Sequence, residues 1–193
     1  KKIRNEIGVS IDTKIILGCG NIRSGKGFER FVEIVKLCTI STDKNISGVI
    51  LGEGELLCDI KELAKLYEGI TSIHFLGYKN NIIDYLLASD VFLFPSEHEV
   101  MPMVLIEASS CGIPIVCSDI LGNNDIVSDS LNGFLISGDD YEYCKKIIQI
   151  LNDTNLQECM GNQGLEMTKK RFEKNLVVNQ IVQLYFEVVS KTL

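Results

Sequence analysis

Short apolar runs alternate with segments of helical periodicity along the chain, and this alternation constrains the fold more than any other feature. Repeated βα units predict a mostly parallel sheet with helices on both faces. The runs are almost continuously apolar, as expected for strands that are buried on both sides. The predicted strands are residues 14–20, 46–52, 71–77, 90–95, 113–119 and 133–136. The helices predicted between them are an apolar series at 28–35 and the segments 55–67, 81–88 and 103–110.

From residue 141 onward the pattern is helical only, and it predicts helices at 141–151, 155–171 and 174–190. We therefore expect a Rossmann-like, three-layer α/β fold of about six strands, with a βα core over about 13–140 and extra helices over about 141–193. The apolar face of the last helix is unusually broad. It either packs on the same domain or docks on something that this chain does not contain.

Composition excludes several classes of function. The 193 residues can bury one full core, and the net charge of −7 argues against nonspecific binding of nucleic acid, so no nucleic-acid partner is expected. Seven cysteines, an odd number without a CxxC pair, indicate a reducing compartment. Only His74 and His98 could supply imidazole ligands, and no DxD-like run follows a predicted strand, so no metal is expected.

The sequence also bears on location. No apolar stretch approaches the roughly 20 residues of a membrane-spanning helix. We expect a cytoplasmic protein, with any peripheral contact at the inner membrane face set by other parts of a longer chain. Lys1 rather than Met opens the sequence, which predicts that it is a fragment of such a chain.

Glu99 and Glu107 lie eight residues apart in the most informative stretch of the sequence. The first is predicted in a loop at the carboxyl end of a strand, and the second one to two turns into the next helix. Ligands of open α/β sheets bind at this edge, where helix N-termini attract anions. Pro102 fits the first helical position, and Met101 before it cannot cap the helix.

The backbone amides of Met103 and Val104 are therefore predicted to need an acceptor, which a ligand phosphate would supply. Glu107 could accept two hydrogen bonds from ribose hydroxyls, and Glu99 would lie nearer the group being transferred. Such a site suits a nucleotide sugar. The alternative is that both glutamates are solvated surface residues, and for Glu99 alone this is the better interpretation. Glu107 lies among small and apolar residues, so its carboxylate needs a partner.

A glycine-rich loop at 18–29, GCGNIRSGKGFE, forms a second candidate. Its spacing matches neither a Walker A motif nor G-x-G-x-x-G. It does place Arg23 and Lys26 at the carboxyl end of a strand, where they could neutralise a diphosphate. Ordinary solvated basic residues remain an alternative.

Two further segments follow predicted strands. At Gly77 and Tyr78, backbone groups could bind the edge of a base and the ring could stack on it, although a plain turn explains the same residues. His74 is interpreted as a core side chain. Asp125 is predicted to cap a short helical piece at 126–127, and Asp139 to cap the next helix.

These segments, in this order and spacing, resemble the C-terminal domain of retaining glycosyltransferases with the GT-B fold, and most of all the group 1 family with its E-x7-E signature. Glu99 and Glu107 match that signature, and Pro102 matches its internal proline. GNIRSGKG resembles the glycine-rich loop of the family, with Lys26 on its lysine. The resemblance covers essentially the whole chain.

The resemblance implies roles for the matching positions. Lys26 would bind the donor phosphates, Glu107 the ribose hydroxyls and Glu99 the donor sugar. The amides near Met103 and Val104 would contact phosphate and sugar. The protein would transfer a sugar from a nucleotide diphosphate sugar, with UDP or GDP as the expected carrier, with retention of configuration and without a metal or other cofactor.

The loops before this helix would complete the donor site. The turn after Phe75, with Gly77 and Tyr78, would hold the base. Gly20 and Asn21 would also contact the donor nucleotide sugar.

Three departures from the family pattern concern the fine geometry of the site. Asn21 stands where the family usually has arginine, and Arg23 is the candidate to replace its charge. Val100 replaces a common glycine. Asn123 and Asp125 replace a frequent glycine and a frequent glutamate.

The resemblance also implies that an N-terminal domain, which would bind a glycan or lipid-linked acceptor, is absent from this sequence. The fragment is therefore expected to bind donor but to transfer no sugar. Two other functions stay open: a nucleotide-sugar 2-epimerase on a similar scaffold, and a nucleotide-binding module without chemistry.

Overall fold

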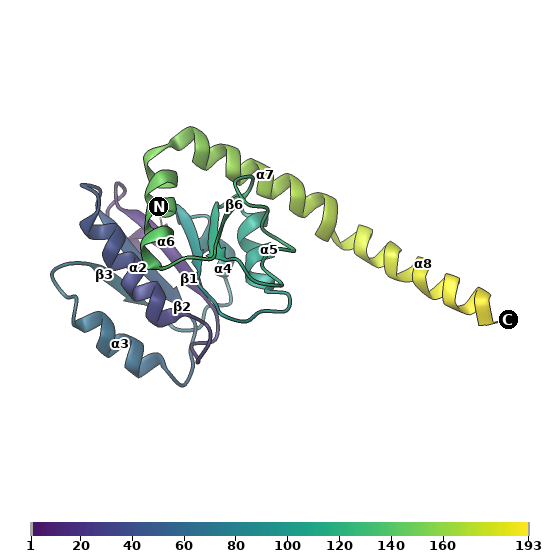
Figure 1. Ribbon diagram of the computed structural model, residues 1–193, viewed down its shortest axis with the longest axis horizontal. Helices are drawn as coiled ribbons and strands as arrows, with labels where there is room; N and C mark the ends of the chain where they lie inside the picture. Colours follow the sequence, from purple (N-terminus) through teal and green to yellow (C-terminus); the bar gives the residue numbers. More distant parts are fainter. Residues whose placement is uncertain (1, 193) are drawn as a thin grey trace.

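A six-stranded, wholly parallel sheet forms the centre of the molecule in the computed structural model, which describes residues 2–192 (Figure 1). The strand order is β3-β2-β1-β4-β5-β6. The strands are β1 (Lys14–Cys19), β2 (Ile46–Leu51), β3 (Ser72–Phe75), β4 (Val91–Phe94), β5 (Ile115–Ser118) and β6 (Gly133–Ile136). The predicted α/β fold with about six parallel strands is confirmed.

Helices cover both faces of the sheet because successive strand residues point to opposite sides. Ile16 and Ile50 belong to one core and Ile15 and Val49 to the other. The first core lies under α2 (Phe28–Ile40), α3 (Leu57–Lys65) and α6 (Asp140–Asn152). The second lies under α1 (Lys2–Ile7), α4 (Ile82–Leu86) and α5 (Met103–Ser110). This is the three-layer arrangement that the sequence predicts.

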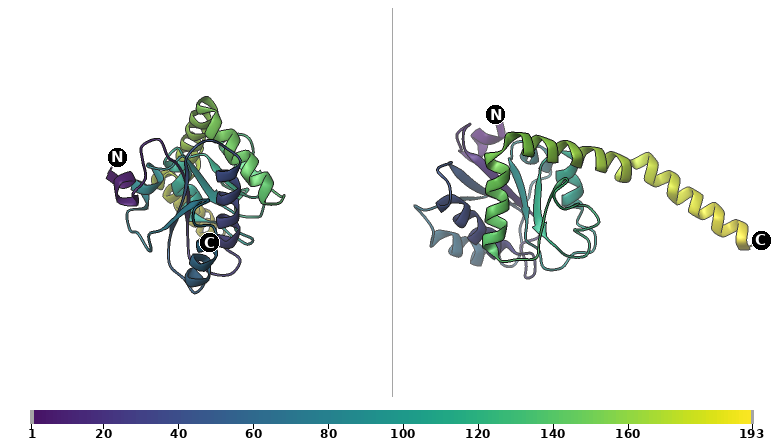
Figure 2. Two further views of the ribbon diagram at one scale, coloured as in Figure 1. Left: turned by 90° about the vertical axis from the view of Figure 1, so that its left-hand side faces the viewer. Right: turned by 45° about the horizontal axis from the view of Figure 1, so that its top comes forward.

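The chain closes with α7 (Thr154–Phe172) and α8 (Lys174–Thr192). Helix α7 packs closely on the end of α5, since the backbone of Gly161 approaches the carbonyl of Gly112 so nearly that a Cβ there would stand 2.2 Å from it. Helix α8 instead projects away from the body of the molecule (Figures 1 and 2). Its predicted apolar face is therefore exposed, with Tyr185 and Phe186 more than two-thirds accessible.

Local predictions differ from the structure in four places. Helix α1 has no counterpart in the predicted pattern, because its six residues span fewer than two turns. Pro102 is the N-cap of α5 rather than its first residue. His74 is only partly buried, lies on the edge strand β3 and contacts Ser72, so it is not a core residue. Burial still lowers the pKa of its imidazole.

The segment after β5 holds the fourth difference. Residue 126 ends a turn and residue 127 lies outside any helix. The amides of both donate to the carbonyl oxygen of Asn123, not to Asp125. The prediction for Asp139 is confirmed, because its side chain accepts hydrogen bonds from the amides of Tyr141 and Glu142. Among residues 2–192, no helix combines the length and the apolar character needed to cross a bilayer.

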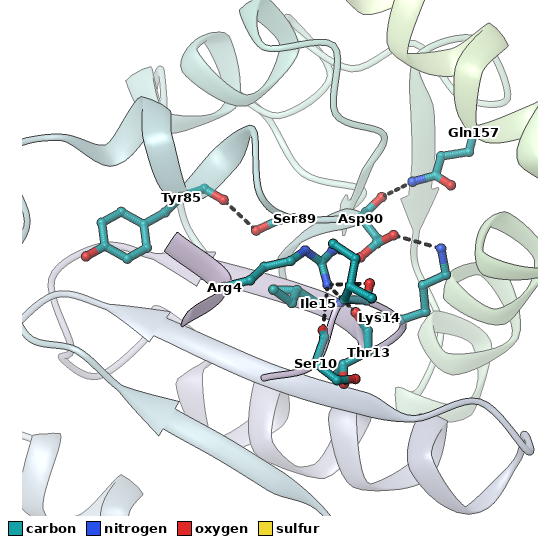
Figure 3. Close-up of polar contacts among 10 residues, drawn as sticks. Arg4, Ser10, Thr13, Lys14, Ile15, Tyr85, Ser89, Asp90 and Gln157 are labelled. Carbon is teal, nitrogen blue, oxygen red and sulfur yellow. Dashed lines mark hydrogen bonds and ion pairs between the residues drawn. The ribbon is translucent and has the colours of Figure 1, made fainter. Parts of the chain in front are cut away.

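Asp90 ties the two central strands together at their amino ends (Figure 3). One carboxylate oxygen accepts the amide of Ile15 at 2.9 Å and the guanidinium of Arg4 at 3.0 Å, and the other accepts Lys14 Nζ at 2.9 Å. Gln157 of α7 donates to the backbone oxygen of Asp90 at 3.0 Å. Because the carboxylate is nearly buried, its bonds join α1, β1 and the start of β4 in one network.

Replacement Asp90→Asn should lower the free energy of unfolding by about 2 kcal/mol, because an amide cannot replace the charge-assisted bonds to Arg4 and Lys14. Urea unfolding measures this difference. The exposed pair of Glu62 and Lys65 provides the control, since Glu62→Gln should change stability by less than about 0.5 kcal/mol. Equal effects of the two substitutions would contradict the role assigned to Asp90.

Candidate functional site

The candidate site lies beside β1, where the order in which the chain adds strands to the sheet reverses. Strand β1 is paired on one side with β2 and on the other with β4, so the crossovers before and after this point run in opposite directions. A crevice opens at the carboxyl ends of strands at such a switch point, and ligands of α/β proteins bind there. The loops after β1 and β4 carry Lys26 and Glu99.

Lys26 and Glu99 form an ion pair across this switch point. Lys26 Nζ lies 2.6 Å from Glu99 Oε1, and both side chains are largely withdrawn from solvent, with exposed fractions of 18% and 9%. Each charge would be costly at this depth without the other. The two residues that the sequence assigns to phosphate and to sugar are thus in direct contact.

Glycine brings the two loops together. Gly27 is the N-cap of α2 at φ 71°, and a Cβ on it would stand 2.0 Å from the carbonyl oxygen of Pro95. Only glycine, which has no Cβ, can combine this left-handed conformation with so close an approach. Beside it, the amide of Glu97 donates to the carbonyl oxygen of Gly25 at 2.9 Å.

The remaining loops at this edge touch one another in sequence. The amide of Gly52 donates to the carbonyl oxygen of Gly77 at 2.9 Å, and a Cβ on Gly52 would meet the carbonyl oxygen of Gly20 at 1.9 Å. On the other side, a Cβ on Gly122 would stand 2.6 Å from the oxygen of Val100. The loops after β1 to β5 therefore form one continuous rim.

Helix α5 presents an uncapped N-terminus to this rim. Pro102 has no side-chain acceptor to offer, and the first bond of the helix runs from the amide of Leu105 to the carbonyl oxygen of Pro102 at 3.0 Å. The amides of Met103 and Val104 precede that bond, so they have no acceptor within the helix. The positive end of the helix dipole thus points toward the site.

Glu107 lies one turn further along α5, half-buried beside two thiols. Burial raises the pKa of its carboxyl above the usual range. Burial and the charge of Glu107 together raise the pKa of Cys19, at the end of β1, to about 12, and the same two causes raise that of Cys111. Glu107 therefore faces the end of β1 and needs hydrogen-bond donors to stabilise its charge.

The other predicted residues spread along the rim. Asn21 is exposed, and its side-chain oxygen stands against Gly54 in the loop after β2. Arg23 is also exposed and does not take part in the ion pair with Glu99. Phe75 ends β3, and Tyr78, 73% accessible, stands beyond it.

Strand β3 is three strand spacings from β4, roughly 14 Å. The base site predicted at Gly77 and the carboxylates are thus separated by a distance that an extended nucleotide could span.

Sequence reasoning missed two features of the site, the contact of Ser96 with Glu99 and the burial of Asn123. Ser96, fully buried, donates to Glu99 Oε1 at 2.7 Å, a contact that only the folded loop creates. Asn123 is also fully buried; its amide nitrogen donates to the Ser118 oxygen, and its Oδ1 has no partner in the described part of the chain. Within those same residues, no group of three or more His, Cys, Asp or Glu side chains is arranged to hold a metal ion.

A hollow of about 960 Å³ lies at the opposite end of the sheet. It is lined by residues that precede β2 and β3, among them Lys44 and Thr71. Concavity alone would thus have placed the site at the wrong edge for a parallel sheet.

Curated relatives are similar over most of this chain. N-acetyl-alpha-D-glucosaminyl L-malate synthase of Bacillus anthracis is 28% identical over 97% of the chain and 49% of its own length. The Escherichia coli UDP-Gal:alpha-D-GlcNAc-diphosphoundecaprenol alpha-1,3-galactosyltransferase is 33% identical over 73% of the chain and 37% of its own length. The chain thus spans about half the length of the first relative and less of the second.

Solved structures share the fold. HepE of Anabaena, in complex with UDP and glucose, superposes with a TM-score of 0.85 at 20% identity, over 96% of this chain and 51% of that one. TarM of S. aureus, in a complex that contains UDP, gives a TM-score of 0.82 at 22% identity, over 89% and 35%. The family model of glycosyl transferases group 1 matches residues 1–167, and the chain belongs to this family.

Proposed function

We propose that this chain is the donor-binding half of a retaining glycosyltransferase of glycan biosynthesis. The observation that carries the proposal is the Lys26–Glu99 pair at the switch point, beside the uncapped N-terminus of α5. A cation and helix amides that have no acceptor within their own helix suit a diphosphate. A carboxylate next to them suits the hydroxyls of the attached sugar.

Each group then has a task in the transfer. The bond between the anomeric carbon and the diphosphate oxygen breaks while an acceptor hydroxyl oxygen bonds to the same face of that carbon, and the hydroxyl proton passes to the leaving diphosphate. The negative charge that develops on the diphosphate is stabilised by Lys26 and by the amides of Met103 and Val104. These groups supply the positive charge without a metal. Glu107 accepts the ribose hydroxyls, and the turn at Gly77 and Tyr78 holds the base.

The acceptor is proposed to bind on a further part of the protein. The chain spans about half the length of its first curated relative, and the apolar face of α8 is uncovered. We assign that face to the remainder of a longer, cytoplasmic protein. Relatives named for lipopolysaccharide core and capsular polysaccharide synthesis support a glycan or lipid-linked acceptor.

Calorimetric titration of the chain with UDP, GDP and ADP tests the donor site. One nucleotide should bind, with the same affinity in EDTA. Lys26→Ala and Glu107→Ala should each weaken binding about tenfold or more, because each removes hydrogen bonds to a charged group. Lys65→Ala, on the exposed end of α3, is the control and should bind normally. Normal binding by the Lys26 and Glu107 variants would refute the site.

Glu107→Gln should raise the thermal stability of the chain at pH 7 but weaken its binding of nucleotide. Burial raises the folded-state pKa of Glu107 above the unfolded value, so the native state binds its proton more tightly and loses stability as pH rises through that interval. The variant has no charge to bury. Its Tm should exceed that of the unmodified chain at pH 7 and match it below about pH 4, while nucleotide binding at pH 7 weakens. A Tm difference independent of pH would contradict this account.

A further inference from the structure

We propose that Ser96 is a positioning residue that holds the carboxylate of Glu99 in place when Lys26 turns to the donor diphosphate. The inference rests on the proposed function. Ser96 is the second residue after β4 and is completely buried. Its hydroxyl lies 2.7 Å from Glu99 Oε1 and 3.1 Å from the carbonyl oxygen of Gly25.

The single hydroxyl proton of Ser96 belongs to the bond with Glu99. A distance of 2.7 Å is that of a charge-assisted bond to a carboxylate, whereas 3.1 Å exceeds the usual range for O–H donors. The Gly25 oxygen already receives the amide of Glu97 at 2.9 Å. The hydroxyl of Ser96 therefore donates its proton to the Glu99 carboxylate, which is the stronger acceptor, rather than to the carbonyl oxygen of Gly25.

In the described part of the chain, the two side-chain bonds to the Glu99 carboxylate end on the same oxygen. Lys26 Nζ reaches Oε1 at 2.6 Å and Ser96 reaches it at 2.7 Å. This leaves Oε2 as the atom available to a sugar hydroxyl. When the ammonium group of Lys26 moves to a phosphate, Ser96 keeps Oε1 fixed and Oε2 aimed at the sugar.

The backbone around Ser96 is well placed to act as an anchor. The residue before it, Pro95, lies against Gly27, and the residue after it, Glu97, is bonded to Gly25. Contacts on both sides thus fix the segment to the glycine-rich loop. A side chain held in this way loses little further entropy when the ligand binds, which is the requirement for a preorganised site.

Paired titrations with UDP and UDP-sugars test the inference. The probes are UDP, UDP-glucose, UDP-galactose and UDP-N-acetylglucosamine, or GDP and GDP-mannose if the chain selects guanine. Ser96→Ala should weaken the tightest nucleotide sugar about tenfold and the bare diphosphate by less than about twofold. Loss of a purely structural bond would weaken both alike.

A double-mutant cycle with Glu99→Gln shows whether Ser96 acts through Glu99. In the Gln background, Ser96→Ala should change sugar-nucleotide affinity by less than about twofold. Independent effects that simply multiply would overturn the proposal, as would equal losses for UDP and UDP-sugar or no loss for either. Ser118→Ala is the control, because it removes a different buried hydroxyl, which accepts a hydrogen bond from Tyr143 at 2.8 Å. It should leave the preference for nucleotide sugar over bare diphosphate unchanged.

Two results distinguish a failure of this inference from a failure of the proposed function. Binding of no nucleotide by the unmodified chain would overturn the proposed function, and the role of Ser96 with it. Normal binding with an unaltered sugar preference in Ser96→Ala would overturn the role of Ser96 alone. Ser96→Cys fills the same space with a weak donor, so it should reproduce the loss of sugar binding if the alanine variant fails to fold.

Discussion

Parallel pairing of β1 with β4 is the interaction on which both the core and the site depend. It aligns Ile16 with Val91 and Leu17 with Phe92. At its amino end the carboxylate of Asp90 joins the two strands, and at its carboxyl end Lys26 and Glu99 meet. The register that buries apolar side chains on both faces thus also sets the distance between the charges above them.

The fold could be predicted from the sequence because its signals are local. Continuous apolar strands and helical spacing identified all six strands, and α5 was predicted at its exact bounds. The strand ends were less accurate: three predicted strands ran past their observed ends into Gly20, Gly52 and Gly77, which have positive φ angles. Apolar periodicity does not register a change of backbone conformation at glycine.

The charged residues of the candidate site and the uncapped start of α5 were predictable from the sequence. Lys26, Glu99 and Glu107 were recognisable from type and spacing, and the structure places the first two in contact. Ser96 and Gly27 were not, because their importance arises from close approach between loops about 70 residues apart. The sequence does not distinguish a buried serine from an exposed one, or a closely packed loop glycine from an ordinary one. Only the tertiary contacts do.

The isolation of α8 from the core affects the stability of this helix. The 19 residues of α8 stand apart from the core, whereas most helical stability in proteins comes from tertiary packing of an apolar face. Its amide hydrogens should exchange with solvent far faster than those of β1, which lies in the middle of the sheet. If α8 docks as proposed, docking and helix formation would be coupled, and part of the docking free energy would be used to order the helix.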